Sequence, residues 1–185
     1  MLLGALDPEK LFVISDTHFG HAAILQYSNR PFKDLDHHNT QLVKSWNSAV
    51  PEDATVLHLG DFAMGQITEE NIRKYGPLNG ARKILVAGNH DEKLRERGLA
   101  SLHFHEVYDC VRFRVGKKSV IASHYPFETW REDYHTHGHT HGERAEYIKP
   151  GRMDVGVDAW PIAERDYAPK SWAQVVARFK ARDGK

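Results

Sequence analysis

The chain has 185 residues, of which 41% are hydrophobic and 27% charged, a composition typical of one soluble globular domain. Lys plus Arg and Asp plus Glu number 25 each, so no net charge draws the chain to nucleic acid or to a membrane. Cys110 is the sole cysteine, which excludes an internal disulfide and favours a reducing, cytoplasmic location. No signal peptide or membrane-spanning apolar run is expected. The unusual feature is the presence of 13 histidines, the commonest metal ligands.

The first predicted strand is the continuous apolar run Leu11–Ile14, which indicates a strand buried on both faces. Asp16 and His18 follow it, and residues two apart on an extended segment point to the same side. These two side chains are therefore candidates to bind one ion together. The alternative is a helix cap, with Asp16 or Thr17 beginning a helix toward Tyr27.

Residues 34–50 show the spacing of an amphipathic helix, which Asp34 is placed to cap. His37 and His38 fall in this helix, and we expect both to face solvent. The helix separates the first strand from a second apolar run.

That second strand is predicted at residues 55–59, and Gly60 and Asp61 follow it. Asp61 stands at the strand's end, as Asp16 does, although a simple turn is the alternative. His58 lies inside the strand, which favours a structural role. A short helix with Thr68 as its cap comes next.

The apolar run 84–87 indicates a third strand, and Gly88 allows a sharp turn after it. Asn89, His90 and Asp91 follow the turn. The order strand, helix, strand, helix, strand predicts a parallel sheet, whose ligands bind beyond the carboxyl ends of the strands. The polar side chains after the three strands are therefore expected to form one site.

The second half of the chain begins with a predicted hairpin. Residues 111–115 alternate between apolar and basic, residues 119–122 return, and His124 follows. The basic residues of the hairpin are candidates for a nucleic-acid groove or for an exposed, solvated turn: Arg112, Arg114, Lys117 and Lys118.

Four histidines then occupy alternate positions: His135, His137, His139 and His141. On an extended segment they would share one face, where metal binding would explain their clustering. A solvated histidine-rich loop is the alternative. Residues 155–157 predict a late strand, and residues 171–181 a helix with Ser171 and Gln174 as its capping box. We expect a single domain over residues 1–185.

Taken in order, these motifs closely resemble the calcineurin-like metallophosphoesterase superfamily, in particular its small bacterial and phage members. The motifs are Asp16-x-His18, Gly60-Asp61, Gly88-Asn89-His90-Asp91, His124 and Gly138-His139-Thr140-His141. The resemblance covers the chain from about Leu11 to Asp158. It implies an α/β fold, specifically an α/β/β/α sandwich formed by a single domain.

The resemblance also implies two divalent metal ions. The first would be held by Asp16, His18 and His141, the second by Asn89, His124 and His139, with Asp61 bridging both. Imidazole and carboxylate ligands suit manganese foremost, with iron or zinc as alternatives, better than they suit calcium.

The implied activity is hydrolysis of phosphate esters, foremost diesters, with nucleotides and nucleic acid among the candidate substrates. Paired ions would neutralise the phosphate and activate a water molecule. Asp61 and Asn89 belong to the catalytic set, and His90 would protonate the leaving oxygen, oriented by Asp61 or Asp91. Further histidines are candidates for lining the site, with a solvated side chain as the alternative: His21, His135 and His137.

The chain departs from the family's protein phosphatases, which place an arginine shortly after the bridging aspartate. No arginine stands there after Asp61, which favours a diester over a phosphoprotein substrate. Residues 161–165 are predicted to form an extra loop. Two other hypotheses compete: a metal-binding scaffold without activity, and a histidine-rich metal-storage protein, which leaves Asp16, Asp61 and Asn89 unexplained.

Overall fold

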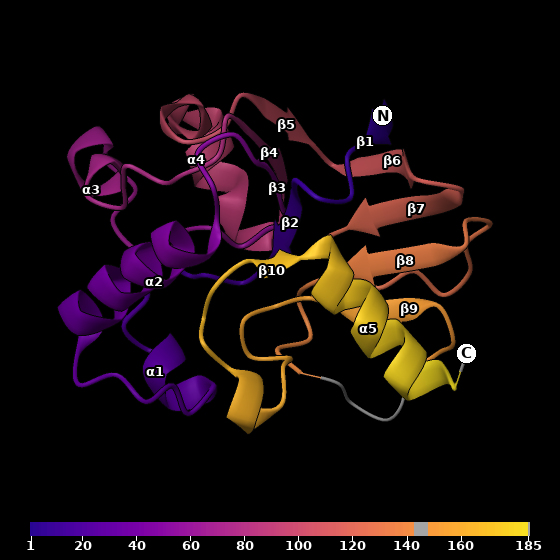
Figure 1. The fold of residues 1–185 in the computed structure, drawn as a ribbon. Coiled ribbons are helices and arrows are strands. Elements are labelled where there is room, and N and C mark those ends of the chain that lie inside the picture. Colours follow the sequence, from indigo (N-terminus) through magenta and orange to yellow (C-terminus); the bar gives the residue numbers. More distant parts are fainter. Residues whose placement is uncertain (143–147, 185) are drawn as a thin grey trace.

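The computed structural model describes residues 1–142 and 148–184, which form a mixed α/β structure with two five-stranded sheets (Figure 1). One sheet, here the β3 sheet, has the strand order β10-β2-β3-β4-β5. Its strands are Lys170–Ser171 (β10), Leu11–Ile14 (β2), Thr55–His58 (β3), Arg82–Val86 (β4) and Glu106–Tyr108 (β5). The other, here the β7 sheet, has the order β1-β6-β7-β8-β9. Its strands are Leu2–Leu6 (β1), Cys110–Val115 (β6), Lys118–Ser123 (β7), Tyr134–His137 (β8) and Arg152–Asp154 (β9).

Five α-helices are described alongside the sheets. They are Ile24–Tyr27 (α1), Leu35–Ala49 (α2), Glu69–Arg73 (α3), Glu92–Glu96 (α4) and Trp172–Asp183 (α5). In the part of the chain that the structure describes, short 3₁₀ helices occur at Asn89–Asp91, Leu99–Leu102 and Ile162–Glu164. Within the described residues, the helices are too short or too polar to cross a lipid bilayer.

The predicted parallel sheet is confirmed. β2, β3, β4 and β5 are mutually parallel, and β10 joins β2 antiparallel at the edge. Because α2 connects β2 to β3 and α3 connects β3 to β4, the carboxyl ends of these strands meet at one edge of the sheet. The polar motifs that follow β2, β3 and β4 lie at this edge, whereas His124 follows β7 and the last histidine motif follows β8 of the other sheet.

Two apolar cores hold the layers together. Val13 and Leu57 of the β3 sheet share a core with Phe113 and Val120 of the β7 sheet, so the two sheets pack face to face. The opposite face of the β3 sheet packs against helices α2, α3 and α4, through side chains such as Trp46. Figure 1 shows these helices on one side of the β3 sheet, away from β6–β9.

Helix α5 lies on the inner side of the β7 sheet. The rings of Trp172 and Phe113 are 6.0 Å apart, and those of Phe179 and Tyr134 are 4.5 Å apart. Phe113 belongs to the same core that contains residues of the β3 sheet. α5 therefore lies beside the β3 sheet, and it does not form the second outer helical layer that an α/β/β/α sandwich requires.

Most predicted helix ends are confirmed. The Asp34 carboxylate caps α2 by accepting from the His37 amide at 2.8 Å, and Ser171 with Gln174 forms the capping box of α5. The prediction that His38 faces solvent is wrong, because its ring is fully buried, although His37 is exposed as expected. α1 begins at Ile24 without a side-chain cap, so the alternative role of Asp16 or Thr17 as a cap is also wrong.

The late strand lies earlier than predicted, at Arg152–Asp154. Residues 155–157 instead cross between the sheets. The Val155 amide donates to the His137 carbonyl of the β7 sheet at 2.8 Å, and the Val157 amide donates to the Ser15 carbonyl beyond β2 at 3.1 Å. This segment therefore joins the two sheets at the edge where the polar motifs gather.

Candidate metal centre

The loops after β2 and β3 are bonded to each other through their backbones. The Asp16 amide donates to the Gly60 carbonyl at 2.9 Å, and the His18 amide donates to the Asp61 carbonyl at 3.0 Å. The Ser15 hydroxyl also donates to the Gly60 carbonyl, at 3.2 Å. These bonds set the side chains of Asp16, His18 and Asp61 next to one another.

Asp91 joins the loop after β4 to this pair. Its buried carboxylate accepts from the amides of Asp61 (2.7 Å), Phe62 (2.9 Å) and Gly88 (2.9 Å). Asp61 and Asp91 are the two residues expected to orient His90. Among the described contacts of these two residues, those to His90 come from Asp61. Its Oδ1 accepts from the His90 amide at 3.0 Å, and its Oδ2 lies 3.9 Å from His90 Nε2.

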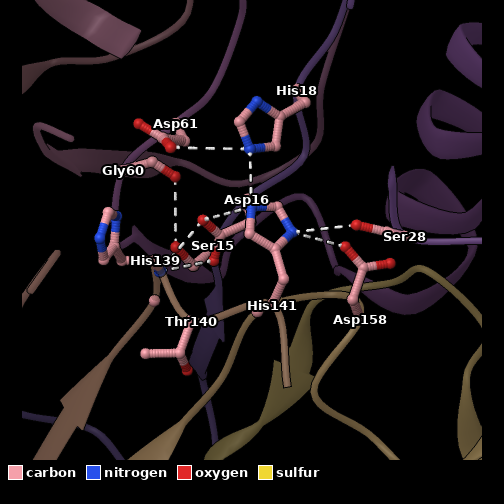
Figure 2. A network of polar contacts seen from close by, with 12 residues as sticks. Ser15, Asp16, His18, Ser28, Gly60, Asp61, His139, Thr140, His141 and Asp158 are labelled. Carbon is pink, nitrogen blue, oxygen red and sulfur yellow. Dashed lines mark hydrogen bonds and ion pairs between the residues drawn. The ribbon is translucent and has the colours of Figure 1, made fainter. Parts of the chain in front are cut away.

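Asp16, His18 and His141 form the first group of potential ligands, with one ligand atom of each within 4.8 Å of the others. The Nε2 atoms of His18 and His141 lie 3.2 Å apart, and His141 Nε2 lies 3.9 Å from Asp16 Oδ1 (Figure 2). Asp61 Oδ2 is 3.6 Å from His18 Nε2. This is the set expected for the first ion.

The second group consists of Asp61, His124 and His139. Asp61 Oδ2 lies 3.4 Å from His124 Nε2, and Asn89 Oδ1 lies 3.1 Å from the same nitrogen. The Asp61 carboxylate therefore lies between the two groups, in the position expected of a bridge. His90 also lies close enough to form a group with His18 and Asp61.

Five of these residues adopt left-handed backbone conformations, which side chains other than glycine rarely tolerate. Seven described non-glycine residues have a positive φ, and five belong to the two groups: Asp16 (59°), His18 (53°), Asp61 (56°), His139 (71°) and His141 (49°). The backbone of these segments is therefore not extended as expected, although Asp16 and His18 do lie in one ligand group. Strain of about 1–3 kcal/mol per residue is typical of functional sites.

Burial and charge act against each other in the site. Burial lowers the pKa of His18 to about 2, despite the nearby Asp61 carboxylate. Burial and the charge of Asp154 raise the pKa of Asp16 to about 7. For His124, burial disfavours the proton, but Asp61 and Asp16 outweigh it and raise the pKa to about 9. The raised pKa of Asp16 means that a nearby positive charge would stabilise the ionised form of this buried carboxyl.

A buried ion pair missed by the sequence analysis supports the first group. Asp158 accepts from His141 Nδ1 at 2.9 Å and from Arg30 Nη2 at 2.7 Å (the His141 bond is drawn in Figure 2). Arg30 also donates to the carbonyls of Asp16 (2.6 Å) and Thr17 (2.8 Å). One guanidinium therefore fixes both the loop after β2 and the carboxylate behind His141. The signal for Asp158 was its place after an apolar run, as for Asp16.

Glycines let the loops approach closely. A Cβ at Gly60 would lie 2.5 Å from His124 Nδ1, and one at Gly88 would lie 2.7 Å from the Asp61 amide. Gly88 is extended, with φ −97° and ψ −178°, so the sharp turn expected there is not formed. The site requires glycine at position 88 because a side chain there would collide with Asp61. At Gly156, a Cβ would lie 2.6 Å from Asp16 Oδ2.

The remaining candidate histidines divide into two kinds. The His21 ring lies 5.3 Å from that of His18 and 6.2 Å from that of His90, so it lines the site. His135 is buried away from it, where its ring stacks on Phe127 at 5.0 Å and accepts from the Phe127 amide. His137 is also buried, with Nδ1 2.8 Å from the Gly138 carbonyl. The last two are therefore structural.

The basic hairpin gives no support to a nucleic-acid groove. Arg112 pairs with Glu132 at 2.5 Å, and Lys118 pairs with Asp133 at 2.8 Å. His58, as expected, is structural: it is fully buried, and its Nε2 lies 2.9 Å from the Thr17 hydroxyl.

Comparisons with known proteins give relatives whose names state no activity. No family model matches the chain. The chain is 29% identical to the uncharacterized protein MJ1445 of Methanocaldococcus jannaschii, over 90% of this chain and 89% of that protein. A crystal structure of the protein of unknown function AQ665 from Aquifex aeolicus matches with a TM-score of 0.71 and 26% identity, over 91% of this chain and 98% of that one.

Two phage proteins extend this set. The gene 66 protein of Mycobacterium phage L5 is 32% identical, over 79% of this chain and 85% of that protein. The gene 66 protein of Mycobacterium phage D29 is 31% identical, over 79% and 86%. At this identity and coverage, the chain belongs to the same family as the mycobacteriophage gene 66 proteins.

Proposed function

We propose that the chain is a phosphoesterase that depends on two divalent metal ions and acts foremost on phosphodiesters. The observation that carries the proposal is the convergence of seven residues, separated by up to 125 positions, into two adjacent ligand groups, with Asp61 within 3.6 Å of a histidine of each. We also propose that the two stacked sheets are a form of the metallophosphoesterase sandwich, with ligand loops at the carboxyl edge of the β3 sheet.

The donor set fits two ions. Neutral imidazole and ionised carboxylate are the forms that bind divalent metals. Burial keeps His18 neutral, while His124 opposes the effect of burial on Asp61 and holds the pKa of that carboxyl below its usual range. At His124, an ion would take the place of the proton that the Asp61 and Asp16 carboxylates favour there, since they outweigh burial and raise the pKa of its ring. Imidazole, carboxylate and amide ligands suit manganese, with iron and zinc as alternatives. When bound, the ions would supply Lewis-acid stabilisation of the phosphate and a water of lowered pKa.

The chain's own residues would position the substrate and move the proton. His90 is held by its backbone bond to Asp61, and its ring is half-buried at the edge of the site. Its Nε2 is placed to donate a proton to the leaving oxygen, a step worth about 10²–10⁴-fold in rate. Asn89 adds a neutral oxygen ligand beside His124.

The competing hypothesis is a metal-binding scaffold of the same fold. A scaffold has no need of a histidine at the edge of the ligand groups, where His90 lies, nor of strained ligand loops. Both features favour catalysis.

The test is hydrolysis of bis(4-nitrophenyl) phosphate beside 4-nitrophenyl phosphate. The protein is first stripped of metal, and manganese is then restored. We expect cleavage of the diester only with manganese, and faster than that of the monoester. A matched control is His135→Gln, which removes a buried histidine outside the site and should leave the metal requirement unchanged. Two bound ions without cleavage of either ester would favour the scaffold.

A further inference from the structure

Two exposed tyrosines border the candidate metal centre. Tyr27 is 77% exposed and Tyr125 is 49% exposed. Among the described residues, they are the two aromatic side chains in the set of exposed large hydrophobic residues. Single exposed apolar side chains are common. A shared location beside one site is what makes this pair informative.

Tyr125 lies beside the second ligand group. Its ring is 4.6 Å from that of His139 and 5.1 Å from that of His124. Its hydroxyl donates to Asn89 Oδ1 at 3.3 Å. The hydroxyl is therefore anchored by a residue of the site, while about half of the side chain stays open to solvent.

Tyr27 lies beside the first ligand group, at the end of α1. Its ring is 6.2 Å from that of His21, and the His21 ring lies 5.3 Å from that of His18. Figure 2 shows Ser28, the next residue in the chain, on one side of the ligand cluster and His139, the neighbour of Tyr125, on the other. Tyr27 thus borders the first ligand group and Tyr125 the second, and Asp61 lies between the two groups.

We propose that the substrate is a phosphodiester joining two nucleosides, the linkage of single-stranded nucleic acid, with one base stacked on Tyr27 and the other on Tyr125. The inference rests on the proposed phosphodiesterase function. A diester phosphorus carries two ester groups that extend in different directions, so a phosphate at the ligand groups directs one nucleoside toward each ring. Stacking on an aromatic face is favourable for every base, because every base has a π-face.

The charge distribution favours a short single strand over a duplex. Duplex binding depends on many contacts between phosphates and basic side chains. The chain has no net charge, and acidic partners neutralise Arg112 and Lys118 of the basic hairpin. Recognition through two rings beside the scissile phosphate does not need a large basic surface.

The experiment compares thymidylyl-thymidine with analogues that lack the 5′-side base, the 3′-side base or both, using the manganese-loaded chain. We expect each base to raise kcat/KM by about tenfold. Tyr27→Ala should remove the advantage of one base, and Tyr125→Ala the advantage of the other. Tyr27→Phe and Tyr125→Phe keep the ring and should keep both advantages, which separates stacking from the hydroxyl bond to Asn89.

Binding gives a second readout that does not require turnover. In the manganese-loaded His90→Ala variant, calorimetry should show about tenfold tighter binding of the dinucleotide for each base present. Manganese-dependent cleavage of methyl 4-nitrophenyl phosphate, with equal kcat/KM for the dinucleotide and its base-free analogue, would overturn this inference and leave the proposed function standing. An effect confined to one base would overturn the two-sided arrangement. If the manganese-loaded chain does not cleave methyl 4-nitrophenyl phosphate, this would count against the proposed function itself.

Discussion

The substitution Asp158→Asn should weaken metal binding at the first ligand group and leave the second unchanged. Asp158 is 3% exposed and accepts from His141 Nδ1 at 2.9 Å and from Arg30 at 2.7 and 3.1 Å. A carboxylate that accepts from Nδ1 leaves Nε2 as the nitrogen with a free lone pair, facing Asp16 and His18. An amide in its place can donate to Nδ1 instead, which puts the proton on Nε2 and blocks its use as a ligand.

The expected effect of Asp158→Asn has two parts, a loss of metal affinity and a loss of folding stability. Loss of a partner that orients a metal-binding histidine typically costs 10–100-fold in metal affinity, or about 1.4–2.8 kcal/mol. Removing one charge of a buried ion pair costs about 3–5 kcal/mol of folding stability. Arg30 keeps its bonds to the Asp16 and Thr17 carbonyls, so we expect the lower end, about 3 kcal/mol.

The assay is titration calorimetry of manganese into metal-stripped protein, with urea unfolding of the same samples. We expect one of two binding steps to weaken, because His124 and His139 do not contact Asp158. Asp183→Asn is the matched control, since its carboxylate accepts from Arg182 and from the Gly151 amide. Equal weakening of both steps, or unchanged affinity in a folded variant, would refute the orienting role of Asp158.

Three other predictions concern His90, the glycines and the ions. His90→Ala should retain both ions by calorimetry yet lose about 10²–10⁴-fold in turnover, whereas retained turnover would exclude a proton-donating role. Gly60→Ala should destabilise the fold by about 2–5 kcal/mol in urea unfolding, because the φ of Gly60 is +98° and an added Cβ would meet His124. The control Gly98→Ala, at φ +69° in open space, should cost about 1–2 kcal/mol. Equal costs for the two variants would contradict the close packing at Gly60. Manganese at 100 times its dissociation constant should stabilise the chain by about 2.7 kcal/mol in unfolding experiments, and a chelator should reverse this; an unchanged midpoint would argue against a site formed by the fold.

The elements that the sequence predicts well are those in which local signals and burial agree. β2 is a run of four residues that are all buried, and α2 combines an apolar stripe with an Asp34 cap. The resemblance also named the members of both ligand groups, because their order along the chain is specific. Their convergence follows from parallel strands that end at one edge.

What the sequence could not predict depends on contacts between distant residues. Arg30 looks like an ordinary surface arginine until Asp158, 128 positions away, is placed against it. His38 was expected to be exposed because its helical face gave no sign that Arg30 would cover it, with Nη1 2.8 Å from its Nε2. The alternating histidines suggested one extended face, but only β8 is a strand there, and the backbone is left-handed at His139 and His141.

The hydrogen bonds among the strand-end loops link the site to the folding of the whole chain. The amides of Asp16, His18 and His139 are bonded to groups 44, 43 and 123 positions away. We expect such bonds to form late in folding, because long stretches of chain must be ordered before they can form. No peptide excised from the chain can reproduce the ligand geometry, so ions would report the completed fold. In hydrogen exchange, these loop amides should be protected like those of the strands, although loops usually exchange fast.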